Sequence, residues 1–138
     1  MKKYELIDHT ADIGFRVFGQ DHSELFQNAG YALFDVITDI SRVSPLVMRR
    51  FSLQRNCMEE LLVEWLSNLL YVFDTEQLLF CNFQVSKICD TGLEAEAAGE
   101  LYSEDLHPIK TVVKAITYHC LNIANRNGVW QATTILDI

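Results

Sequence analysis

Five consecutive residues near the start of the chain, Asp8-His9-Thr10-Ala11-Asp12, combine two carboxylates, an imidazole and a hydroxyl. One interpretation is a turn in which the Asp8 and Thr10 side chains bond to nearby backbone N–H groups. The other is a binding site for a cation. In either case the segment lies between two stretches whose alternation is typical of strands, so it is expected to connect them.

The other end of the sequence favours the cation site. It runs almost wholly apolar and β-branched and then finishes Leu136-Asp137-Ile138, so that Ile138 would offer a terminal carboxylate beside Asp137. If the last strand packs near the first, up to four carboxylates converge, and they need a compensating cation. Carboxylate oxygens suit a hard ion such as calcium, magnesium or manganese rather than zinc.

Lys114 is the third residue that could do chemistry. Alternation places it on one face of a strand with Val112, Ile116 and Tyr118. A lysine in such a run is usually an edge or solvent-facing residue. Its functional alternative is a fixed positive charge beside the carboxylates or reaching toward a phosphate. His119 is predicted on the opposite face in a structural role, whereas His9 could orient a carboxylate.

Two amphipathic helices are expected to position these residues. Asp21 and Glu24 have the spacing of a capping box, and apolar residues at helical spacing follow over 22–38. Asn56 and Glu59 are predicted to open a second helix in the same way. Its apolar stripe continues to Phe73 and is typical of a core helix.

Strands are predicted over 13–19 and 46–53, as several short strands over 78–101, and over 112–123 and 129–138, with a hairpin turn at 125–128. The break at 106–109 could hold a short helical turn. We therefore expect one α+β domain, residues 1–138. Its architecture is predicted as a two-layer sandwich, with two amphipathic helices on one face of a mixed, mostly antiparallel sheet.

Composition excludes several classes of protein. The 138 residues carry a net charge of −8, and residues 54–106 hold eleven acidic and two basic side chains. This acidic region is expected to form either solvated faces or a docking face for a basic partner. Direct nucleic-acid binding is therefore not expected. Four unpaired cysteines, no apolar signal core and no membrane-spanning stretch favour a cytoplasmic protein. No glycine-rich phosphate loop or G-x-S-x-G motif supports an autonomous NTPase, dehydrogenase or hydrolase.

The chain resembles the archease family. The resemblance rests on YELIDHTADIGF at 4–15, VVKAITYH at 112–119 and ILDI at 135–138. The two predicted helices, with DxxELFQNAGYALF and EELLVEWLSNLLYVF, also match in the family's order. The likeness thus covers essentially the whole chain.

This resemblance implies a small α+β protein that assists the RtcB-type RNA ligase, the GTP- and manganese-dependent enzyme of tRNA splicing and RNA repair. It would promote the ligase's guanylylation and repeated turnover without being an enzyme itself. The implied metal ligands are Asp12, Asp137 and Ile138, the last through a main-chain or terminal oxygen, and the implied activating residue is Lys114. Calcium is the first expected cation, with manganese or magnesium as alternatives; Asp8 matches the motif without an assigned role.

Two alternatives stay open. One is a stand-alone metal-dependent phosphoesterase that uses Asp8, His9, Asp12 and Asp137 with two metals. The other is a chaperone-like binding module in which the cation is structural.

Overall fold

The computed structural model describes residues 2–9 and 12–138, and it leaves the side chains of Asp8 and His9 undescribed. Over these residues the chain forms two α-helices, one short 3-10 helix and eight strands. In chain order the elements are β1 Tyr4–His9, β2 Asp12–Gly19, α1 His22–Ile37, η1 Ile40–Arg42, β3 Val47–Gln54, α2 Met58–Glu76, β4 Leu78–Cys89, β5 Gly92–Leu101, β6 Ala115–Ile116, β7 Asn122–Arg126 and β8 Val129–Asp137.

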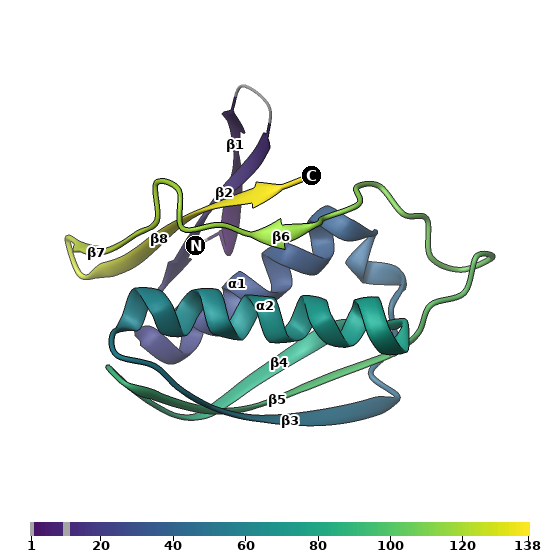
Figure 1. Ribbon diagram of the computed structural model, residues 1–138, viewed down its shortest axis with the longest axis horizontal. Coiled ribbons are helices and arrows are strands. Elements are labelled where there is room, and N and C mark those ends of the chain that lie inside the picture. Colours follow the sequence, from purple (N-terminus) through teal and green to yellow (C-terminus); the bar gives the residue numbers. More distant parts are fainter. Residues whose placement is uncertain (1, 10–11) are drawn as a thin grey trace.

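The strands divide between two sheets, and every pair is antiparallel. One sheet has the order β1-β2-β8-β6, with β7 also paired to β8, and the other has the order β3-β5-β4. The two helices lie between them, so the layers are sheet, helices and sheet (Figure 1). The expected α+β class is confirmed. The predicted two layers with a single mixed sheet differ from the structure, which has two antiparallel sheets with the helices against one face of each.

Helix α1 begins where the sequence predicted. The Asp21 side chain accepts a hydrogen bond from the Glu24 backbone N–H at 2.8 Å, while the Glu24 carboxylate accepts one from Gln20 N–H at 3.0 Å. Helix α2 differs from the prediction, because its N-cap is Cys57 rather than Asn56 and no side chain caps it. Its start therefore depends on burying the apolar stripe rather than on a capping box.

One continuous core joins the two sheets through the helices. Trp65 of α2 is fully buried, and its indole N–H donates to the Phe26 carbonyl of α1 at 2.9 Å. The Trp65 ring also meets Phe51 of β3 and Phe83 of β4 edge-to-face. The position of α2 is therefore fixed against both α1 and the three-stranded sheet. Among the described residues, no helix is long and apolar enough to cross a membrane.

The predicted strand over 112–123 is wrong. Residues 111–114 are irregular, β6 is two residues long, and a turn intervenes before β7. Cys120 adopts φ +55°, which a continuous strand does not tolerate, and Leu121 N–H bonds back to the Tyr118 carbonyl at 3.2 Å. β6 and β7 are thus two short strands along the same edge of β8.

The last hairpin follows the predicted turn. Arg126 pairs with Val129, which leaves Asn127 and Gly128 as a two-residue loop with φ values of +56° and +83°. Positive φ at both positions is what a type I′ turn requires, and Asn-Gly is its favoured sequence. The hairpin fixes the register of β7 against β8.

Candidate functional site

The start of β2 and the end of β8 meet at one end of the five-stranded sheet. β2 begins at Asp12 and β8 ends at Asp137, and the two strands pair antiparallel with Ile13 opposite Leu136. One step beyond that pair, Asp12 and Asp137 lie abreast on adjacent strands. Residues that oppose each other in antiparallel strands share a face of the sheet. The two carboxylates therefore start from neighbouring backbone positions and the same face.

That face is the outer one, turned away from the helices. Phe15 and Val17 of β2 are fully buried in the core, as are Ala132 and Leu136 of β8. Because side chains alternate along a strand, Asp12 and Asp137 belong to the opposite face. Asp137 is exposed and Asp12 is half-buried. A partner can therefore reach this site from solvent.

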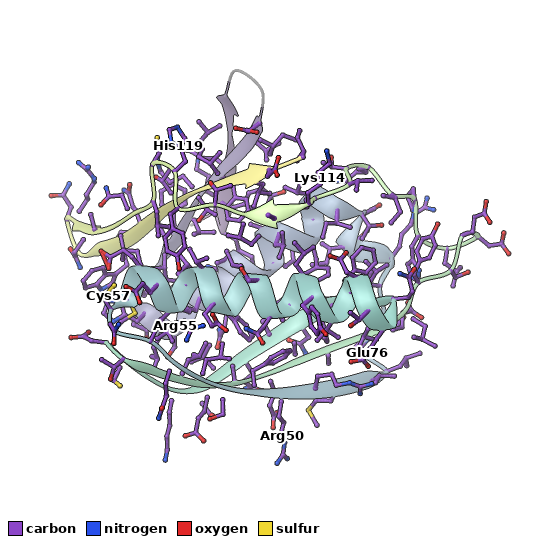
Figure 2. All side chains as sticks on the ribbon, viewed as in Figure 1. Arg50, Arg55, Cys57, Glu76, Lys114 and His119 are labelled. Atoms are coloured by element: carbon purple, nitrogen blue, oxygen red, sulfur yellow. The ribbon has the colours of Figure 1, made fainter. Side chains whose placement is uncertain are left out.

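Lys114 lies on the other side of Asp137. Its backbone N–H donates to the Asp137 carbonyl at 2.7 Å, and Ala115 pairs with Asp137. Figure 2 shows the Lys114 side chain beside the ends of β6 and β8. The prediction that Lys114 and Ile116 share one face of a strand is wrong, since Ile116 is buried and Lys114 is exposed. The reason is that the strand begins only at Ala115, so alternation does not extend back to Lys114.

The remaining residues of the first motif are only partly described. Asp8 pairs with Ile13 and His9 with Asp12 along the β1–β2 ladder, so both belong to a strand. The predicted hydrogen bonds of Asp8 and Thr10 fall outside the described residues, as does any role of the His9 ring. His119 is exposed, and its backbone N–H donates to Thr117 Oγ1 at 3.2 Å.

Asp12 and Asp137 could hold a hard cation only if main-chain oxygens also serve as ligands. Among the side chains that the structure describes, which exclude those of Asp8 and His9, no three His, Cys, Asp or Glu residues gather in a way that could hold a metal ion. Because the Asp137 carbonyl already accepts the Lys114 N–H, Asp137 would coordinate through its side chain. Asp12, Asp137 and a main-chain oxygen of Ile138 form an all-oxygen set, which is the chemistry that calcium, magnesium and manganese prefer.

A buried histidine shapes the segment that leads to Lys114, and the sequence analysis assigned it no role. His107 is 1% exposed; its Nδ1 accepts the Ser103 backbone N–H at 2.9 Å, and its Nε2 lies 3.1 Å from Glu100 Oε2. Since Nδ1 accepts, the proton sits on Nε2 and is donated to Glu100. His107 N–H also bonds to the Ser103 carbonyl at 2.8 Å, which closes a single helical turn in the predicted break.

The Glu100 carboxylate is the centre of this arrangement. It accepts the Ser44 backbone N–H at 2.7 Å, and this bond, followed by the contact with His107, holds the pKa of Glu100 below its usual value. Further along, Thr38 Oγ1 donates to the Pro108 carbonyl at 2.7 Å and Lys110 N–H to the Ile37 carbonyl at 2.8 Å. The path from β5 to Lys114 is therefore tied both to Ser44 and to the end of α1.

Comparisons with known proteins agree over the whole length. The family model of the Archease protein family matches residues 4–138. The protein archease of Methanosarcina mazei is 41% identical over 141 residues, covering 99% of this chain and 97% of that relative. That of Sulfurisphaera tokodaii is 40% identical over 139 residues and covers both chains fully.

Two solved structures share the fold. The solution structure of Methanobacterium thermoautotrophicum protein 1598 superposes with a TM-score of 0.85 at 37% identity, with full coverage of both chains. A crystal structure from Thermotoga maritima, described as an archease and a possible chaperone, has a TM-score of 0.70 at 17% identity and covers 96% of this chain and 94% of that one.

Proposed function

This chain belongs to the archease family, and we propose that it is an accessory protein that activates an RtcB-type RNA ligase in tRNA splicing and RNA repair. It would promote the ligase's guanylylation and its multiple turnover. The observation that supports this most is the placement of Asp12 and Lys114 on either side of Asp137 at one accessible sheet end. These are the residues that the family resemblance implicates.

The roles follow from chemistry and position. Asp12, Asp137 and an Ile138 main-chain oxygen would hold a divalent cation, which would supply fixed positive charge for ordering phosphate oxygens. Lys114 presents a second positive charge beside them. Its backbone is held by Asp137, so the side chain projects from a fixed point. Positioning and electrostatics of this kind dominate phosphoryl and nucleotidyl transfer.

The acidic character of the chain fits a protein partner. A net charge of −8 disfavours binding to RNA alone, whereas a ligase active site that gathers GTP and RNA must be basic. We therefore propose transient docking of this sheet end near the guanylylation site of the ligase.

Guanylylation of an RtcB-type ligase with GTP and manganese, measured with and without this protein, tests the proposal. Asp137→Ala and Lys114→Ala should each lose most of the stimulation. Asp90→Ala and Lys87→Ala are matched controls, because both residues are exposed at the three-stranded sheet, away from the site. If Asp137→Ala and Lys114→Ala both stimulate like the wild type, the proposal is wrong.

The two alternatives give different results in the same preparation. Sustained hydrolysis of a phosphoester by the protein and manganese without ligase would indicate a phosphoesterase. A chaperone-like module with a structural cation would melt at lower temperature after chelation, yet folded carboxylate variants would keep full stimulation.

A further inference from the structure

A second polar feature lies on the outer face of the five-stranded sheet. Arg16, Asn122, Ala124, Arg126, Gln131 and Thr133 line a pocket of about 340 Å³. Arg16 of β2, Thr133 of β8 and Asn122 of β7 lie abreast, because Arg16 and Asn122 both pair with Thr133. Gln131 lies two residues before Thr133 on β8. The lining thus combines two guanidinium groups, two amides and a hydroxyl, with no carboxylate.

The charge of this pocket contrasts with the rest of the molecule. Arg16 donates to the Glu5 carboxylate at 2.6 Å, and Lys2 pairs with the same carboxylate at 2.5 Å. Arg126 makes no ion pair within the described part of the chain. Glu5 therefore neutralises only one of the two cations that it pairs with, and Lys2, Glu5, Arg16 and Arg126 together carry a net positive charge. This is a local positive patch on a protein whose net charge is −8.

The pocket shares its face with the candidate metal site. Asp12 and Arg16 are four residues apart on β2, as are Thr133 and Asp137 on β8. Even spacing keeps each pair on one side of its strand, and the rise per residue separates them by about 14 Å. A single flexible nucleic-acid strand could contact both the pocket and the candidate metal site at once.

We propose that this pocket binds a phosphate group of the RNA strand on which the ligase partner acts, an inference that rests on the proposed function. Guanidinium groups bind phosphate through paired charged hydrogen bonds. The amides of Asn122 and Gln131 can both donate to phosphate and accept from a ribose 2′-hydroxyl, which an acidic peptide lacks. Because the chain as a whole carries a net charge of −8, binding by the isolated protein would be weak and confined to this pocket.

The test follows backbone amide signals of the isotope-labelled protein by NMR at low salt. The probes are a short single-stranded oligouridylate, inorganic phosphate and a short poly-glutamate peptide. We expect the oligouridylate to shift the signals of Asn122, Gln131 and Thr133, with shifts that decrease as salt is added. Arg126→Gln should weaken this binding about tenfold. Arg50→Gln, an exposed arginine on the other sheet (Figure 2), should leave it unchanged.

Three results would overturn the proposal. If oligouridylate does not shift the signals of the pocket residues, the pocket is not the binding site. If inorganic phosphate binds the pocket as tightly as oligouridylate does, the pocket does not recognise RNA. Tighter binding of the glutamate peptide would identify a pocket for an acidic protein segment. Because no ligase is present, failure here leaves the guanylylation assay as an independent test of the proposed function.

Discussion

The backbone N–H of Lys114 donates to the carbonyl oxygen of Asp137 at 2.7 Å. This bond joins the last residue of an irregular segment to the last residue of β8. Asp12 occupies the neighbouring strand on the other side of Asp137. Asp12, Asp137 and Lys114 are thereby ordered side by side, and β8 is the strand that brings them together.

Glu100 should make stability depend on pH. The pKa of Glu100 is lower in the folded protein than in the unfolded chain. The ionised carboxylate therefore stabilises the fold at any pH above its pKa in the unfolded chain. This stabilisation is lost as the pH falls through its pKa in the folded protein. Glu100→Gln should lower the melting temperature at pH 7, and the gap to the wild type should narrow as pH falls below about 4. Thermal melts across this range measure it. Glu104→Gln, exposed in the loop that follows β5, is the control; a gap that stays constant with pH would contradict the assignment.

Gly99 should be intolerant of any side chain. A Cβ there would lie 1.7 Å from the Leu79 carbonyl oxygen, a backbone atom of the paired strand beside a β-bulge. Gly99→Ala should cost about 3 kcal/mol or more, or prevent folding. At Gly92 the nearest atom to a Cβ is Cys89 Sγ at 3.6 Å, so Gly92→Ala is the matched control and should be tolerated. Urea unfolding compares the two, and similar losses would argue against the close approach at Gly99.

Trp65 should be the main link between the helices. Trp65→Phe removes the hydrogen bond to the Phe26 carbonyl and leaves a space, at a cost of about 1–3 kcal/mol in the free energy of unfolding. Tyr71→Phe changes an exposed residue of the same helix and should shift that energy by less than about 0.5 kcal/mol. Equal effects in urea denaturation would mean that the indole contact contributes little.

Local signals in the sequence predicted the local structure well. The Asp21–Glu24 cap, the apolar stripe of α2 and the Asn127-Gly128 turn each act over a few residues. The division into two sheets could not be predicted in this way, because strand pairing joins residues far apart in sequence. Nor did alternation reveal the turn at Cys120, where β-branched and aromatic neighbours suggested a continuous strand.

The candidate site shows the same division. Residue types, the end of the sequence and a family resemblance singled out Asp12, Asp137 and Lys114. In the structure Asp12 and Asp137 lie on the adjacent strands β2 and β8, and Lys114, just before β6, bonds to Asp137. The His107–Glu100 contact gave no sequence signal, because a buried histidine with two satisfied nitrogens resembles any other loop histidine. The outer-face pocket needed the register of three strands to appear.

Manganese titration of the isotope-labelled protein, followed by paramagnetic broadening in NMR spectra, tests the central claim most directly. If Asp12, Asp137 and Ile138 hold a divalent cation, the amide signals of Ile13, Leu136 and Lys114 should broaden first and those of Arg50 and Glu96 last. Calcium should reverse the broadening, and Asp137→Asn should abolish it. Broadening that begins elsewhere, or that survives Asp137→Asn unchanged, would contradict the site.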